Sequence, residues 1–316
     1  MVAEDRKGSE SGEMSKKNGK VKHRMRLICV FLAVALVLLC CPLDSRAEED
    51  IDPVENDIRT WKGFIYGCEG SLEDCSQLTI YNYKGSKREL TIPKEINGIK
   101  VKWVFSLSKA KNLRILHIPN GVQVHYALAK APKLKKITVL KSNRRYSVKG
   151  NALLNKTGTV LMGYPGGYST LKVPNGVTRI GSEICGERFK SIQWGKNLKY
   201  IGSGAFGDNR YIEKVVLKNK VEVIGSGAFN NCRKLKNVVL GKNVKVIGYM
   251  AFNGCDKLKS IYIYNSKCKI VPPDKYDYGT SNITIPRTTT IYGWKGSTAE
   301  RFAKKYKIKF VELKKW

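Results

Sequence analysis

The chain has few acidic residues and almost no histidine. Its 316 residues include 26 Asp and Glu against 58 Lys and Arg, and only three His. Only His117 and His125 lie beyond the N-terminal segment, and no Ser/His/Asp or Cys/His arrangement can be assembled around them. No cysteine pair or histidine cluster has the spacing of a metal site. The sequence therefore predicts no enzyme, no metal site and no cofactor.

The scarcity of acids leaves a formal net charge of +32. A field of that size favours polyanionic partners and fast, salt-sensitive association. Acidic glycans, anionic cell-wall polymers, nucleic acids and anionic membrane surfaces all fit this description, and the charge does not choose among them. We expect no specific nucleic-acid partner, and membrane contact only through the N-terminal segment.

No apolar run in the chain is long enough for an ordinary membrane span, which needs about 20 residues. The longest runs only from Leu27 to Cys41, follows a basic stretch and precedes Ser45-Arg-Ala47. This order is typical of a secretory signal peptide over residues 1–47, with an uncleaved anchor as the alternative. We expect a flexible linker over residues 48–60 and a secreted or cell-surface protein.

One phrase occurs three times at a constant interval. It reads Ile201-Gly-Ser-Gly-Ala-Phe206, Ile224-Gly-Ser-Gly-Ala-Phe229 and Ile247-Gly-Tyr-Met-Ala-Phe252. Each copy is followed by a segment such as Leu235-Lys-Asn-Val-Val-Leu240, whose first, fourth and sixth residues are apolar. A fixed period of about 20–29 residues predicts a leucine-rich solenoid, in which each coil contributes one short strand and packs on its neighbours.

The pattern I-G-x-x-A-F-x-x-C-x-x-L-K-x-V-x-L resembles the BspA-like leucine-rich repeat family over residues 201–263, with Cys232 and Cys255 at the family's cysteine position. The resemblance implies a mainly β, right-handed solenoid with short turns and helices. It also implies a binding role on a secreted or surface protein, with adhesion as the usual suggestion. It does not supply a ligand.

The same resemblance divides the chain. It implies a β-rich N-terminal capping module over residues 61–104, repeats over 105–281 with a hairpin insertion near 141–170, and a helix-strand cap over 282–316. In the first module we expect Gln77–Ile80 and Leu90–Pro93 to pair. In the last, Ser297-Thr-Ala-Glu300 is typical of a helix start.

Cysteines and glycines suggest other chemistry, which the sequence context supports to different degrees. Cys68 and Cys75 form either a disulfide, which export would permit, or two packed thiols. Cys232 and Cys255 share one repeat position, which favours buried thiols. The stretch Gly202–Gly207 spells the dinucleotide fingerprint G-x-G-x-x-G, but its recurrence in the next copy of the phrase favours a structural turn.

One set of residues is a candidate ligand-binding face. The residue after the first apolar position of each predicted strand is usually basic, which predicts a ladder of cations at the spacing of the coils. The candidates on the ladder and beside it are Arg114, His117, Lys135, Lys136, Lys190, Gln193, Lys214, Lys236, Lys259 and Tyr262. The alternative is that these lysines only keep a repetitive sheet soluble.

These observations favour a non-catalytic binding protein that recognises a protein or a polyanionic glycan through its strands. The first alternative is a basic protein held on the anionic polymer of its own cell wall, without a host ligand. The second is a secreted hydrolase whose site the sequence does not reveal.

Overall fold

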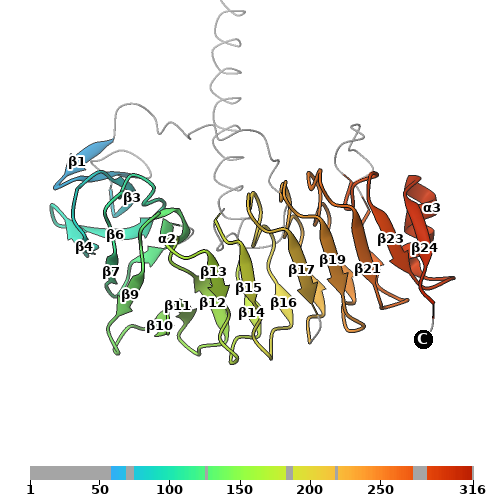
Figure 1. Ribbon diagram of the computed structural model, residues 1–316. Coiled ribbons are helices and arrows are strands. Elements are labelled where there is room, and N and C mark those ends of the chain that lie inside the picture. Colours follow the sequence, from blue (N-terminus) through green and yellow to red (C-terminus); the bar gives the residue numbers. More distant parts are fainter. Residues whose placement is uncertain are drawn as a thin grey trace, which may run out of the picture. The chain divides into compact units, whose positions relative to one another are not determined.

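The computed structural model describes residues 58–68, 75–124, 127–182, 188–217, 220–272 and 283–314 (Figure 1). Over these ranges the chain is mainly β-structure, with two helices, α2 (Ala127–Lys130) and α3 (Thr298–Tyr306). Within the repeats the paired strands follow one another in chain order, so the predicted repeat solenoid is confirmed. The predicted signal peptide, residues 1–47, and most of the predicted linker lie outside the described residues.

One wall of the coils, named here the strand face, consists of short parallel strands. Its members are β4 (Glu89–Thr91), β7 (Ile115–Ile118), β9 (Lys136–Val139), β13 (Thr170–Lys172), β15 (Ser191–Gln193), β17 (Lys214–Leu217), β19 (Asn237–Leu240), β21 (Ser260–Ile263), β23 (Thr290–Gly293) and β24 (Lys309–Glu312). They pair in three separate groups: β4-β7-β9, β13-β15 and β17-β19-β21-β23-β24. Within a group the register is strict, and Val238 lies opposite both Val215 and Ile261.

The opposite wall is one eight-stranded sheet. It comprises β10 (Tyr146–Lys149), β11 (Ala152–Asn155), β12 (Val160–Gly163), β14 (Arg179–Ile180), β16 (Tyr200–Ile201), β18 (Val223–Ile224), β20 (Val246–Ile247) and β22 (Lys269–Ile270). The Ile that opens each repeated phrase ends one of these two-residue strands, and Ile224 lies opposite both Ile201 and Ile247. This wall runs without a break through the regular repeats.

The core lies between the walls and is built from equivalent residues of successive coils. The rings of Phe206, Phe229 and Phe252 stack face to face, with centroids 5.2 and 5.5 Å apart, and all three are fully buried. Leu235 and Leu240 are buried as well, which confirms their predicted inward positions. Burial of such side chains is the main source of stability in the coil, because no single repeat can bury its apolar face alone.

Glycine is required where one coil turns against the next. A Cβ atom added to Gly202, Gly225 or Gly248 would lie 2.5–2.6 Å from backbone atoms of the preceding coil. The amide of Gly225 donates to the carbonyl oxygen of Ile201 at 2.9 Å, which draws the two backbones together. The fingerprint-like glycines over residues 202–207 therefore belong to a coil turn.

The first module is a separate sheet of six strands. They are β1 (Arg59–Trp61), β2 (Phe64–Cys68), β3 (Gln77–Tyr83), β5 (Glu95–Ile96), β6 (Ile99–Val104) and β8 (Gln123–Val124). Cys68 and Cys75 form a disulfide, which is the first of the two alternatives that the sequence left open.

The predicted pairing of Gln77–Ile80 with Leu90–Pro93 is wrong. β3 pairs with β2 and β6, whereas β4 pairs in parallel with β7 and places Leu90 opposite Leu116. Leu90 is buried between the exposed Glu89 and Thr91, so it continues the inward row of the strand face. The strand face therefore begins inside the segment that the sequence assigned to the cap.

Residues 146–163 form an antiparallel meander of β10, β11 and β12, with a turn at Gly158 (φ 73°). β12 then pairs in parallel with β14, so the meander starts the eight-stranded wall. The side chains of β11 divide the core: Leu153 packs into the N-terminal cluster, while Ala152 and Leu154 pack into the repeat cluster.

The chain ends in helix α3 and strand β24. The hydroxyl oxygen of Ser297 accepts a hydrogen bond from the amide of Glu300, and the Glu300 carboxylate accepts one from the amide of Gly296 at 2.5 Å. The second bond reaches one residue further back than an ideal capping box. Phe302 and Ala303 of α3 are buried against the last coil, and β24 pairs with β23.

Candidate binding surface along the strand face

Each strand of the group β17-β19-β21-β23-β24 presents two rows of side chains away from the core. The first row is polar and consists of Lys214, Asn237, Ser260, Thr290 and Lys309. The second row is apolar and aromatic and consists of Val216, Val239, Tyr262, Tyr292 and Val311. The buried residues between these rows fix both of them in register, as expected from the alternation of a strand.

The predicted ladder lies at the edge where the strands begin, one residue before each strand rather than within it. We name its basic members the basic ridge: Arg114, Lys135, Lys190, Lys236 and Lys259. Backbone hydrogen bonds join neighbouring coils at this edge. The amide of Lys135 donates to the Arg114 carbonyl oxygen, and that of Lys259 to the Lys236 carbonyl oxygen, each at 2.9 Å.

The ridge is interrupted twice. The amide of Lys190 donates to the carbonyl oxygen of Ser169, and no described backbone hydrogen bond links β9 to β13 or β15 to β17. The meander enters the chain at the first break. At the second, Trp194 takes the position held by Leu217 one coil later, and its larger ring packs edge-on against Phe206 at 5.7 Å.

The ridge has little acidic compensation. Glu213 lies one coil before Lys236. The Lys236 ammonium group donates a hydrogen bond to the Glu213 carboxylate at 2.8 Å, and this bond lowers the pKa of the Glu213 carboxyl. Within the described ranges, the side chains of Arg114, Lys190 and Lys259 have no ion-pair partner. These three cations are therefore available to an external anion.

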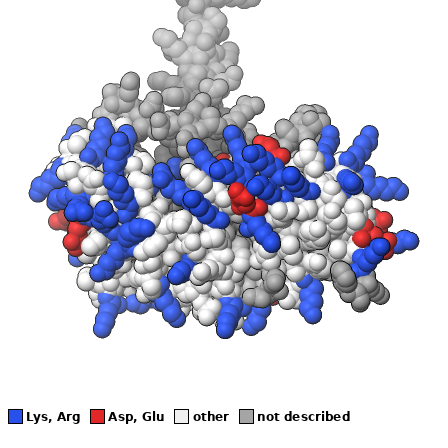
Figure 2. Space-filling model, in the orientation of Figure 1, with Lys and Arg blue, Asp and Glu red and all other residues white. Residues whose placement is uncertain are grey.

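Further cations lie in the turns that lead into the strands. Arg233, Lys234 and Lys257 are exposed there, and Lys234 lies over the Tyr211 ring at 5.2 Å. Figure 2 shows Lys and Arg side chains gathered along the edge at which β15, β17 and β19 begin, around a small acidic patch. The result is a positively charged margin beside the two outward rows.

Of the other predicted residues, Lys136, Gln193 and Lys214 are exposed on the strand face, and Lys214 belongs to the first outward row. Tyr262 lies in the second row, where its ring stacks on Tyr292 with centroids 4.3 Å apart. Burial, followed by the neighbouring Tyr292, raises the pKa of the Tyr262 hydroxyl. The sequence did not reveal Tyr292, because an irregular segment separates it from the regular period.

His117 connects three coils. Its Nε2 atom lies 2.7 Å from Glu89 Oε1, and its Nδ1 atom lies 2.6 Å from Thr138 Oγ1. With a neutral imidazole, Nε2–H donates to the Glu89 carboxylate and Nδ1 accepts from the Thr138 hydroxyl. Glu89 was missed because β4 had been assigned to the cap, outside the repeat register.

Comparison with known families decides the kind of repeat. The description "BspA type Leucine rich repeat region" matches residues 166–292 in six copies. Residues 166–292 are a BspA-type leucine-rich repeat region. The match begins at Gly166, directly after the meander, and ends at Tyr292 in β23. No curated protein matches the chain.

Solved structures of bacterial leucine-rich repeat proteins are similar to the chain. A leucine-rich repeat protein from Eubacterium ventriosum is 23% identical, with a TM-score of 0.48 over 65% of this chain and 56% of that one. The pneumococcal vaccine antigen PcpA is 17% identical, with a TM-score of 0.43 over 82% and 99%. A leucine rich cell surface protein from Faecalibacterium prausnitzii is 15% identical, with a TM-score of 0.43 over 78% and 97%. The chain thus spans little more than half the length of the Eubacterium protein.

Two cysteines of the BspA-type repeat region, Cys232 and Cys255, lie inside the coil. The thiols of Cys232 and Cys255 donate to the carbonyl oxygens of Phe206 and Phe229, at 3.3 and 3.1 Å, and both residues are fully buried. In the preceding copy, Asn209 takes this position and its side-chain oxygen accepts from two backbone amides. These residues close the turn between coils, and they add nothing to the exposed face. No helix in the described ranges has the length and apolar character needed to cross a membrane.

Proposed function

We propose that this protein is a secreted or surface-held binding protein that captures a linear polyanion, an acidic glycan or an anionic cell-wall polymer, along the basic ridge. The observation that supports the proposal is a cation directly before the strand in five of the seven coils from β7 to β21; Ser169 and Glu213 hold this position in the other two. Three of these cations, Arg114, Lys190 and Lys259, lack a described acidic partner. Binding by a surface, without catalysis, is the role that this geometry serves.

Repetition gives the ridge its strength. Neighbouring coils are about 4.8 Å apart, so Lys236 and Lys259 present charges at a short, regular interval. Each exposed contact with an anion is worth little alone, about 0–1 kcal/mol, because water and salt screen it. A polymer that engages several coils at once gains affinity from multivalency, since each further contact is intramolecular.

Export fits the same role. The N-terminal pattern of a basic stretch, an apolar run and small residues is typical of a signal peptide. The disulfide between Cys68 and Cys75 belongs in an oxidising compartment. Outside the cell the ridge would meet host glycans as well as the polymer of the cell's own envelope.

Charge reversal with a matched control tests the ridge. Dextran sulfate and polygalacturonate are immobilised, and the salt concentration that elutes the protein is measured. The triple variant Lys190→Glu, Lys236→Glu, Lys259→Glu should elute from both polymers at a much lower salt concentration than the wild type. The control changes three exposed lysines beyond the strand face, Lys199, Lys242 and Lys269, to Glu, so its net charge is identical. Equal weakening by both variants would mean that net charge, rather than the ridge, binds the polymer.

Extraction from cells identifies the source of the polymer. If the cell's own wall is the partner, moderate salt should release the wild-type protein from intact cells, and the ridge variant should already be in the medium. Retention of both proteins on the cells at high salt would exclude electrostatic attachment to the envelope.

The second outward row favours another candidate, an acidic protein partner. Val216, Val239, Tyr262 and Tyr292 form a half-buried apolar row beside the cations. Tyrosine is enriched where protein interfaces bury side chains, and solenoids use such extended faces to bind proteins. An extracellular-protein array at physiological salt, read with wild type and Tyr262→Ala, distinguishes this candidate from polymer binding.

A further inference from the structure

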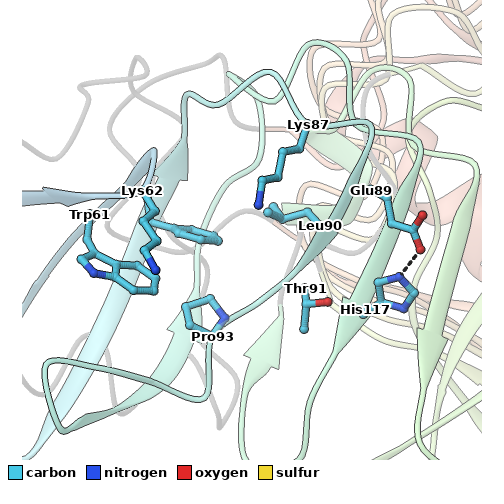
Figure 3. A pocket seen from close by; sticks show the side chains of 9 residues that line it. Trp61, Lys62, Lys87, Glu89, Leu90, Thr91, Pro93 and His117 are labelled. Carbon is cyan, nitrogen blue, oxygen red and sulfur yellow. Dashed lines mark hydrogen bonds and ion pairs between the residues drawn. The ribbon is translucent and has the colours of Figure 1, made fainter.

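A cavity of about 390 Å³ lies between the first module and the start of the strand face (Figure 3). Its lining residues come from hairpin β1–β2, from β4 with its flanking residues, and from β7: Trp61, Lys62, Phe64, Lys87, Glu89, Leu90, Thr91, Pro93 and His117. The volume is within the range of small-ligand sites, roughly 300–1,000 Å³. The cavity is distant in sequence from Lys190, Lys236 and Lys259, and it shares no residue with the basic ridge.

One wall of the cavity is aromatic and basic. The Nζ atom of Lys62 lies 4.6 Å from the centroid of the Trp61 ring, and the ring of Phe64 lies 6.2 Å from the same indole at an interplanar angle of 23°. Lys87 reaches toward the space from the other side (Figure 3). Neither lysine has an acidic partner among the described residues.

The facing wall is polar and held in place. Oε1 of Glu89 is bonded to Nε2 of His117, and Nδ1 of His117 is bonded to the Thr138 hydroxyl. Oε2 of Glu89 has no described hydrogen-bond partner, so it can accept a hydrogen bond from a hydroxyl group of a ligand. Thr138 does not line the cavity, which is why the Glu89–His117–Thr138 chain is a poor candidate for a nucleophilic site.

We propose that this cavity binds a single uronic acid unit, a sugar with a ring carboxylate. The carboxylate would lie between Lys62 and Lys87, the C–H face of the ring would lie against the indole of Trp61, and a ring hydroxyl would donate to Glu89. The charge of the cavity favours an acidic sugar over a neutral one. Two ammonium groups in the cavity have no described ion-pair partner, and its one carboxylate is already bonded to His117.

The position of Lys62 separates this ligand from a nucleotide, which also combines an anion with a ring. A planar base needs an open aromatic face, and the Lys62 ammonium lies over the Trp61 face at 4.6 Å. A puckered sugar ring needs only part of the indole and can place its carboxylate on the same ammonium group. Inorganic phosphate is a poorer candidate than a uronic acid, because it has no apolar ring face to pack against the aromatic wall of the cavity.

Saturation-transfer NMR on the full secreted chain tests the proposal, with D-glucuronate as the probe and D-glucose and AMP as comparisons. We expect glucuronate to bind with a Kd on the order of 1 mM, as befits a ligand of this size. Glucose should bind at least about tenfold more weakly, because it lacks the charge-assisted hydrogen bonds. Equal binding of glucose, or tighter binding of AMP, would overturn the proposal.

Point variants locate the site. Lys87→Gln should raise the Kd for glucuronate about tenfold without lowering the Tm, since the Lys87 side chain has no described partner to lose. Lys84→Gln, an exposed change three residues away and outside the cavity, should leave the Kd unchanged. An unchanged Kd in Lys87→Gln, or an equal loss in Lys84→Gln, would contradict the assignment.

The ridge and the cavity can fail separately. The ridge triple variant at Lys190, Lys236 and Lys259 should lose dextran sulfate and keep the glucuronate signal, whereas Lys87→Gln should do the reverse. Loss of the glucuronate signal in the ridge variant, with the Tm preserved, would place the sugar on the ridge and refute the cavity site.

Discussion

Replacement of Gly225 by alanine tests the contact between coils most directly. The new Cβ atom would lie 2.6 Å from the amide nitrogen of Ser203 and 2.8 Å from the carbonyl carbon of Gly202. Both atoms belong to backbone, so no side chain can rotate away. An ordinary contact begins at about 3.4 Å, and the two coils would have to separate locally by several tenths of an ångström.

The expected loss follows from these distances. Overpacking usually costs about 1–3 kcal/mol, and a clash with hydrogen-bonded backbone belongs at the upper end of that range. The alanine also restricts the unfolded chain, which returns about 0.4–1 kcal/mol. We therefore expect Gly225→Ala to lower the free energy of unfolding by about 2 kcal/mol.

Gly176 supplies the control. An added Cβ atom there meets nothing nearer than 3.9 Å, and the residue is not among those with positive φ. Gly176→Ala should be neutral or slightly stabilising. Urea unfolding followed by circular dichroism measures both variants. A loss of less than about 0.5 kcal/mol in Gly225→Ala, or the same loss in both variants, would refute the close approach of the coils.

Three further predictions concern the disulfide, the ridge and a buried thiol. Replacing Cys68 and Cys75 together by serine should lower the free energy of unfolding by about 2–3 kcal/mol, as expected for a bridge with a sequence separation of 7; denaturant unfolding with no loss would contradict a structural role. Because Glu213 neutralises Lys236, Glu213→Gln should tighten binding to dextran sulfate by about two- to threefold. The hydrogen bond from Lys236 lowers the pKa of the Glu213 carboxyl below its usual 4.5, so wild-type affinity should reach that of the variant only at pH values below 4.5; a salt-elution series that shows no such convergence would count against the pair. Burial raises the pKa of the Cys268 thiol from 9.0 to about 12. Between these pH values the thiol loses its proton only in the unfolded chain, which stabilises the unfolded state. The free energy of unfolding should therefore fall as the pH rises through this window, and it should fall less in Cys268→Ala.

The repeat and its core could be predicted from the sequence because every coil uses the same chemistry. Apolar residues at fixed intervals identified Leu235 and Leu240 as inward, and the recurring phenylalanine identified the stack through Phe229. Periodicity is a property of the amino-acid sequence, so it can be recognised before the fold is known.

The pairing in the first module could not be predicted in the same way. A short strand such as β4 contains one buried residue, Leu90, and alternation over so short a strand does not specify a partner. The partner depends on where the chain enters the solenoid, which is a tertiary property. The same error concealed Glu89, whose contact with His117 spans 28 residues.

The candidate site was only partly visible. A repeated lysine such as Lys236 or Lys259 is conspicuous in the sequence, whereas its pairing is not: Glu213 compensates Lys236, and nothing described compensates Lys259. The two breaks in the ridge were also hidden, because the spacing from Ile192 to Val215 equals the regular repeat period although their strands do not pair. The spacing of the repeated residues indicates where each coil begins, but it does not indicate whether the strands of neighbouring coils are hydrogen-bonded to each other.

The gap between β15 and β17 has a mechanical consequence. On the opposite wall, β14, β16 and β18 remain hydrogen-bonded through the same region, whereas no described backbone hydrogen bond crosses the strand face there. A solenoid whose coils are hydrogen-bonded on one wall only bends most readily at that place, because separating β15 from β17 breaks no backbone hydrogen bond among the described residues. A stiff polymer bound along the basic ridge would then contact two parts of the strand face, one on each side of the gap between β15 and β17. A change in the angle between these two parts would let the strand face follow the curvature of the polymer.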